Sequence, residues 1–237
     1  MKTRNFSLKQ GVALIYSVRA FALVLALSLT ALSSIAASAL EPIDTASSYQ
    51  VVVNKTRPLN PVTYRANDLV KVPKYNPYGR ILRREVSASV VRLGNAMKSA
   101  GKGTLIVQSG YRSYYSQRSI LAAKIRAIGK TKALKLVAKP GYSEHQTGLA
   151  VDFAARGVST LNVSFARTKA GIWLAANAYR YGFVLRYPSG KTAITGYSFE
   201  PWHFRYVGVT VATAMHDRGI KTLEEFYNLP AAPDYLN

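Results

Sequence analysis

Short apolar segments of helical period and of strand character alternate along residues 49–217, and this alternation limits the fold more than any other sequence feature. Apolar residues at helical spacing predict four helices, at 85–100, 116–128, 169–181 and 209–217. Runs rich in β-branched and aromatic residues predict three strands, at 49–53, 104–107 and 183–187. Four prolines between Arg57 and Tyr78 predict an extended, irregular segment. Because the segments lack a regular βαβ order, we expect an α+β fold with a small, mostly antiparallel sheet flanked by helices.

The chain has no cysteine, so it can form neither a disulfide nor a thiolate metal site. With 49% hydrophobic and 18% charged residues, its composition excludes a disordered chain, a collagen-like chain and a polytopic membrane protein. The 32 basic residues outnumber the 11 acidic ones, giving a formal net charge of +21. That charge predicts attraction to a polyanion, which nucleic acid, anionic lipid or an anionic cell-wall polymer could each supply.

The N-terminus has the three parts of a secretory signal peptide over residues 1–39. Four basic residues and no acid precede the uncharged run at 20–32, and the small residues Ala37, Ser38 and Ala39 follow. The alternative is an uncleaved membrane anchor, although the run is short for a span of about 20 residues. We therefore expect an exported protein, periplasmic or at the cell wall or extracellular, that meets envelope polymers and no nucleic acid.

The region between Glu85 and Glu144 contains no acidic residue but eleven basic ones. They are Arg92, Lys98, Lys102, Arg112, Arg118, Lys124, Arg126, Lys130, Lys132, Lys135 and Lys139. Two interpretations stay open: a solvated basic face, or a face that contacts anionic wall polymers.

Two of the three histidines lie close in sequence to acidic residues, which are rare in this chain. His145 precedes Asp152 by seven residues with Gly148 between them, a spacing that suits a turn entering a strand. His203 follows Glu200 by three residues. Two imidazoles and a carboxylate form a common catalytic zinc set, and a further carboxylate beside a zinc-bound water suits a general base. The third histidine, His216, fits no ligand spacing, and we expect a surface cap or salt partner.

Five ordered segments resemble the zinc-dependent D-alanyl-D-alanine carboxypeptidases of the VanY type, related to lysostaphin-like and Hedgehog-type metallopeptidases. The segments are VNKTRPL (53–59), SGYRSYYSQ (109–117), SEHQTGLAVDF (143–153), GFVLRYPSGK (182–191) and EPWHFRY (200–206). The resemblance covers about residues 50–228. It implies a 40–48 lead-in, a zinc carboxypeptidase domain at 49–230 with the zinc site on the sheet, and a tail at 231–237.

The resemblance also assigns roles to individual residues. It implies Zn²⁺ ligands at His145, Asp152 and His203, the catalytic base at Glu200, and a cation for the substrate carboxylate or developing oxyanion at Arg112. Residues that line the peptide pocket in such enzymes correspond to Ser143, Gln117 and Tyr187. For Glu144, support of the metal site and simple exposure both stay open.

The expected activity is removal of the C-terminal D-alanine from peptidoglycan stem peptides by a monomeric zinc enzyme. An L,D-carboxypeptidase or a peptidoglycan endopeptidase of the same family is the nearest alternative. A non-catalytic cell-wall-binding module is the alternative from another class, and the presence of Glu200 disfavours it.

Overall fold

The computed structural model describes residues 41–158 and 161–236. The predicted signal peptide, 1–39, lies outside the described residues. Contacts divide the chain into two units, Met1–Leu40 and Glu41–Asn237. Within the described residues, no helix combines the length and the apolarity needed to cross a membrane.

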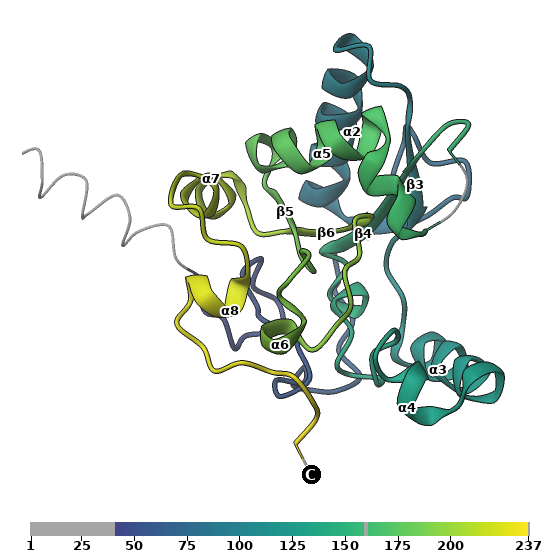
Figure 1. The fold of residues 1–237 in the computed structure, drawn as a ribbon, viewed down its shortest axis with the longest axis vertical. Coiled ribbons are helices and arrows are strands. Elements are labelled where there is room, and N and C mark those ends of the chain that lie inside the picture. The colour runs from purple at the N-terminus through teal and green to yellow at the C-terminus, as the bar shows by residue number, and fades with distance from the viewer. Residues whose placement is uncertain (1–40, 159–160, 237) are drawn as a thin grey trace, which may run out of the picture. The chain divides into compact units, whose positions relative to one another are not determined.

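A four-stranded antiparallel sheet with the order β3-β4-β6-β5 forms the centre of the fold (Figure 1). Its strands are β3 (Leu105–Ser109), β4 (Ala150–Ala155), β5 (Phe183–Leu185) and β6 (His203–Tyr206). The pairing of β4 with β6 sets Asp152 directly opposite His203. The expected α+β fold with a small antiparallel sheet flanked by helices is confirmed.

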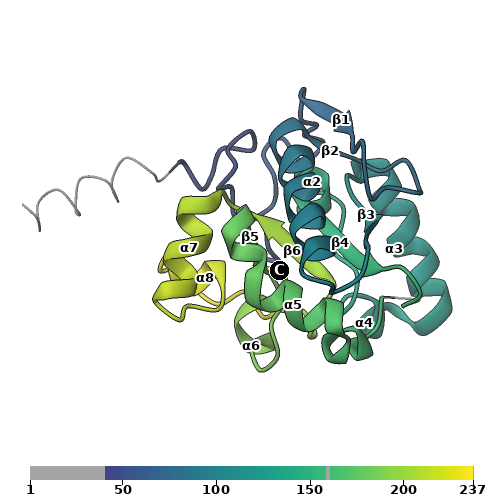
Figure 2. The same cartoon turned by 90° about the horizontal axis from the view of Figure 1, so that it is seen from above.

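The two faces of the sheet differ in character because successive residues of a strand point to opposite sides. Along β4, Val151, Phe153 and Ala155 belong to the main hydrophobic core, whereas Asp152 points to the other face. Helices α2 (Arg84–Ser99) and α5 (Lys169–Asn177) lie beside each other over the core face, as Figures 1 and 2 show. In α2, a stripe of buried apolar side chains at helical spacing meets this core: Val86, Val90, Leu93 and Met97.

The remaining elements surround this centre. Strands β1 (Leu69–Lys71) and β2 (Ile81–Arg83) form an antiparallel pair. The further α-helices are α3 (Tyr114–Ile128), α4 (Lys130–Ala133), α6 (Thr192–Thr195), α7 (Val209–Asp217) and α8 (Leu223–Phe226). The 3₁₀ turns are η1 (Glu144–Thr147), η2 (Val163–Arg167) and η3 (Ala178–Tyr181).

Most of the predicted elements are present, some with different bounds. The helices expected at 85–100, 116–128 and 209–217 correspond to α2, α3 and α7, and the one at 169–181 divides into α5 and η3. The strands expected at 104–107 and 183–187 correspond to β3 and β5. Residues 57–78 are irregular apart from β1.

The strand predicted at 49–53 is wrong. This segment is buried but joins no sheet, and the carbonyl oxygens of Tyr49 and Val51 accept hydrogen bonds from the guanidinium of Arg205 at 3.1 and 2.6 Å. A buried side chain therefore satisfies backbone groups that a neighbouring strand would otherwise bind.

Candidate metal and catalytic site

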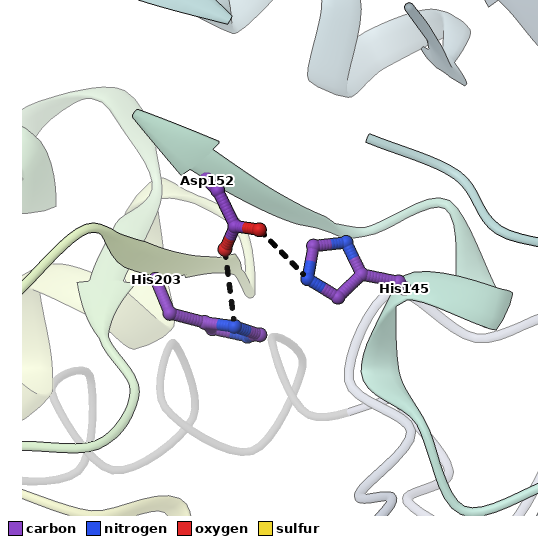
Figure 3. A group of neighbouring side chains, drawn as sticks. All are labelled: His145, Asp152 and His203. Carbon is purple, nitrogen blue, oxygen red and sulfur yellow. Dashed lines mark ion pairs between the residues drawn. The ribbon is translucent and has the colours of Figure 1, made fainter. Parts of the chain in front are cut away.

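Three side chains converge at the polar face of the sheet: His145, Asp152 and His203 (Figure 3). One ligand atom from each lies within 4.8 Å of the others, and all three residues are buried. The two carboxylate oxygens of Asp152 point to different rings. Its Oδ2 lies 3.4 Å from Nε2 of His145, and its Oδ1 lies 3.4 Å from Nδ1 of His203.

Local structure explains how residues 58 positions apart in the chain meet. The β4–β6 register brings Asp152 and His203 together, and the η1 turn brings His145 to the start of β4. Gly148 ends that turn in the left-handed conformation, with φ of 71°. A Cβ added there would lie 2.8 Å from a methyl carbon of Leu69, so both the backbone angle and the space require glycine.

The two histidines present different nitrogens to the site. Nδ1 of His145 lies 2.8 Å from the carbonyl oxygen of Gly110, which can only accept a hydrogen bond, so Nδ1 carries the proton and Nε2 keeps its lone pair. In His203 the orientation is reversed, because Nε2 lies 3.3 Å from Glu144 Oε2 and Nδ1 faces Asp152.

The electrostatic surroundings of the two rings also differ. Burial and the nearby Arg112 guanidinium lower the pKa of His145 to about 4. Burial alone would also lower the pKa of His203, but the carboxylates of Asp152 and Glu144 beside its two ring nitrogens outweigh it and raise that pKa to about 9. In the metal-free protein at neutral pH, His145 is therefore neutral and His203 is protonated.

The donor set fits a zinc ion. Four buried side-chain polar atoms have no hydrogen-bond partner among residues 41–158 and 161–236, and all four belong to this region: Arg112 Nε, Gln117 Oε1, His145 Nε2 and Asp152 Oδ1. Two of these atoms, Nε2 of His145 and Oδ1 of Asp152, carry lone pairs and belong to the three-residue cluster. Two imidazoles and one carboxylate are the usual protein ligands of catalytic zinc, which leave a fourth position for water or substrate.

Glu200 lies at the edge of this cluster, in the turn that leads into β6. Its backbone N–H donates to Tyr187 O at 3.0 Å, its carbonyl accepts from His203 N at 3.1 Å, and its Oε2 lies 3.5 Å from His203 Nδ1. Burial raises the pKa of Glu200 to about 7, although His203 acts in the opposite direction. A carboxyl group with this pKa can both accept and return a proton near neutral pH.

A small cavity of about 40 Å³ joins these groups to the predicted pocket residues. Its lining includes all of the non-ligand site candidates: Arg112, Gln117, Ser143, Tyr187 and Glu200.

Individual contacts fix the pocket residues in place. Arg112 follows β3, and its backbone N–H donates to His145 O at 3.1 Å. Gln117, on α3, donates to Ala138 O at 2.9 Å, and the Tyr187 ring lies 4.7 Å from the His203 ring. The structure thus brings every candidate side chain to one place.

Four charged residues lie behind the metal cluster, and only the first of them was singled out from the sequence: Glu144, Arg186, Arg205 and Glu224. Glu144 is buried rather than exposed, which decides between its two predicted environments. A sequence signal existed, because Glu144 is one of few acids and Arg186 and Arg205 fall within family-like segments. His216 pairs with Asp217 at 3.0 Å near the surface, as predicted.

Comparisons with known proteins agree with this geometry. The family model "VanY: D-alanyl-D-alanine carboxypeptidase" matches residues 79–209. The candidate carboxypeptidase YodJ of Bacillus subtilis (strain 168) is 40% identical over 199 residues, covering 79% of this chain and 70% of YodJ.

Two solved structures show the same similarity. The LD-carboxypeptidase LdcB is 39% identical, with a TM-score of 0.72, over 77% of this chain and 87% of LdcB. A mutant of the D,D-pentapeptidase VanY from a VanB-type resistance cassette, in complex with Zn(II), is 36% identical, with a TM-score of 0.64, over 75% of this chain and 98% of that one. The chain therefore belongs to the VanY family of D-alanyl-D-alanine carboxypeptidases, which are zinc metallopeptidases.

Proposed function

We propose that this protein is an exported carboxypeptidase that releases the C-terminal D-alanine of peptidoglycan stem peptides. The observation that carries the proposal is that a zinc ligand set lies beside a cavity lined by both ligand histidines, a carboxylate with a pKa of about 7 and an arginine. Hydrolysis of a terminal peptide bond requires these three elements: activation of water, proton transfer and recognition of a free carboxylate.

His145, Asp152 and His203 would hold the zinc ion through Nε2, the carboxylate and Nδ1, respectively. When bound, zinc lowers the pKa of a coordinated water to about 7 and polarises a carbonyl oxygen. The neutral Nε2 of His145 and the ionised Asp152 can act as ligands without further proton loss. Burial alone would raise the pKa of Asp152, but the two histidines outweigh it and hold that pKa well below its usual value.

Glu200 would take the proton of the attacking water and return it to the leaving amine. Its carboxylate lies 3.5 Å from a ligand nitrogen, so it is adjacent to the place where water would react. Because the amine departs with the proton that the water gave up, a single residue can serve as base and then acid.

Arg112 would bind the terminal carboxylate of the substrate or the oxyanion that forms at the carbonyl. A guanidinium offers a planar, bidentate pair of donors, and the Nε of Arg112 is buried without a partner in the described part of the chain. Ser143, Gln117 and Tyr187 line the same cavity and would contact the peptide.

We favour cleavage of a D,D bond, in which D-alanine leaves a pentapeptide stem. The L,D alternative, in which D-alanine leaves a tetrapeptide stem, is supported by the similarity to LdcB. A family endopeptidase would instead cut cross-links. All three reactions use the same metal set and base, and they differ in the residues on the two sides of the cut.

Defined tri-, tetra- and pentapeptide muropeptides test this proposal. Each is incubated with the zinc-loaded protein, with and without a chelator, and the products are identified by mass. We expect chelator-sensitive loss of one alanine from the pentapeptide, whereas loss from the tetrapeptide alone would favour the L,D alternative. Release of no amino acid from any stem would refute the carboxypeptidase function.

We further propose that basic residues beside the cavity bind anionic wall polymers. Of the eleven basic residues in the acid-free stretch, Arg112 lines the active-site cavity and Arg92 pairs with Glu85 at 2.7 Å. Six others lie on α3, on α4 or just after α4: Arg118, Lys124, Arg126, Lys130, Lys132 and Lys135.

Lys135 and Lys139 also lie close enough to Lys55 to lower its pKa, together with the larger effect of burial.

If these basic residues bind the wall, binding of the monomeric protein to isolated cell walls should weaken steeply between 50 and 300 mM salt, as expected for screened contacts at a Debye length of about 10 Å near 0.1 M. Salt-independent binding would refute the polymer contact, and wall binding without any hydrolysis would favour a non-catalytic module.

A further inference from the structure

A buried ionic cluster lies directly behind the metal ligand His203. It consists of two carboxylates and two guanidiniums, so their formal charges balance. Its members, all at most 2% exposed, are Glu144, Arg186, Arg205 and Glu224. They come from η1, the segment after β5, β6 and α8.

Glu144 is the member of the cluster that contacts a metal ligand, and its two oxygens have separate partners. Oε1 accepts from Arg186 Nε at 2.8 Å and from Arg205 Nη1 at 3.0 Å, while Oε2 lies 3.3 Å from His203 Nε2. Guanidiniums can only donate hydrogen bonds, so two fixed positive groups occupy Oε1, and Oε2 faces His203 as the acceptor of the Nε2 proton.

The arginines are themselves fixed, so Glu144 cannot easily rotate away. Arg186 forms a bidentate pair with Glu224, at 2.9 and 2.7 Å, and Glu224 also accepts from Asn54 at 2.9 Å. Arg205 donates to the carbonyl oxygens of Tyr49, Val51 and Tyr206.

We propose that Glu144 is a positioning residue that holds His203 with Nδ1 toward the metal, and that the two buried arginines keep Glu144 in place. The inference rests on the zinc site of the proposed function. A carboxylate on the outer nitrogen fixes the tautomer and the ring orientation of a ligand histidine and makes its inner nitrogen a stronger ligand. His145 has a weaker counterpart in the neutral carbonyl of Gly110.

The test compares Glu144→Gln with Glu224→Gln. Each variant removes one negative charge from the same buried cluster, but only Glu144 contacts His203. The measured quantity is the rate at which the zinc-loaded protein loses its ion to a large excess of chelator. The dissociation rate is a property of the zinc-loaded protein alone. An affinity would also reflect the competition between protons and zinc for the ligands of the free protein.

We expect Glu144→Gln to release zinc roughly 10- to 100-fold faster than the unaltered protein, the range typical for loss of such a partner. Glu224→Gln should accelerate release far less, because Arg186 and Arg205 still donate to Glu144, even if thermal unfolding shows similar destabilisation of both metal-free variants. Equal acceleration in both variants would reduce Glu144 to a general structural role, and an unchanged rate in Glu144→Gln would also overturn the proposal.

A second measurement needs no variant and so does not depend on folding. Nitrogen-15 spectra of the zinc-loaded, unaltered protein should show His203 bound through Nδ1 and protonated at Nε2, and His145 with the opposite assignment. Zinc bound to Nε2 of His203 would refute the inference. Neither measurement uses a peptide substrate, so failure of the proposed peptidase activity would be recognised separately.

Discussion

Zinc binding by this protein should release a proton from His203, and the size of the effect follows from its surroundings. In the metal-free protein the pKa of His203 is about 9, because the carboxylates of Asp152 and Glu144 outweigh the effect of burial. Zinc requires the unprotonated nitrogen, so binding below pH 9 must displace this proton. His145, with a pKa of about 4, has no proton to lose at neutral pH.

The cost of this proton to the zinc affinity is largest well below pH 9. At pH 7.5 the proton costs about 2 kcal/mol of zinc affinity, from about 1.4 kcal/mol for each of the one and a half pH units. Between pH 7.5 and 8.5 the unprotonated fraction of His203 should rise about eightfold, which raises the zinc affinity by at least that factor. This window lies above the pKa of Glu200, about 7, so that Glu200 is mostly ionised throughout it.

Competition with a chelator of known proton affinity measures the dependence, and calorimetry in two buffers of different ionisation enthalpy counts the protons. We expect at least one proton released per zinc at pH 7.5, from His203, and a further fraction from a zinc-bound water whose pKa is about 7. A count clearly below one would show that His203 is already neutral in the free protein and would refute its assigned state.

Three further predictions concern activity and stability. Glu200→Ala should keep the fold and the zinc content but lower kcat by about 10²- to 10⁴-fold, and normal turnover by the zinc-loaded variant would disprove its role as the base. Arg112→Ala should lower kcat/KM by about tenfold or more for peptides with a free terminal carboxylate, whereas peptides with an amidated terminus should be affected less. Because the pKa of Glu144 is depressed on folding from an ordinary value of 4.5, the stability that its ionised form contributes is present above that pH and is lost as the pH falls below it. Urea unfolding of the metal-free protein at pH 4.5 and 3 should show this decline, and constant stability over that range would contradict it.

The sequence predicted the elements that depend on local pattern better than those that depend on distant contacts. Helix α7 has the predicted bounds, because its apolar spacing and the glycine beyond it are local signals. The segment 49–53 has strand propensity but no partner strand, since Arg205, 154 residues from Val51, satisfies its carbonyl groups. Propensity alone does not reveal such a partner.

The same contrast between local patterns and distant contacts applies to the site. His145, Asp152 and His203 could be singled out because histidines and acids are rare in this chain. The contact of Glu144 with His203 could not, since it depends on Arg186 and Arg205, which are 42 and 61 residues away in the chain. A buried carboxylate is identified only when the groups that neutralise it are known.

The position of Asp152 opposite His203 has a consequence for how the sheet acquires its pairing. A slip of one residue between β4 and β6 would leave only one of the two ligands on the metal face, because side chains alternate along a strand. Incorrectly aligned pairs therefore cannot offer both ligands to one ion. Binding free energy is available to the native alignment alone, so zinc would widen the energy gap between the correct sheet and its misaligned competitors.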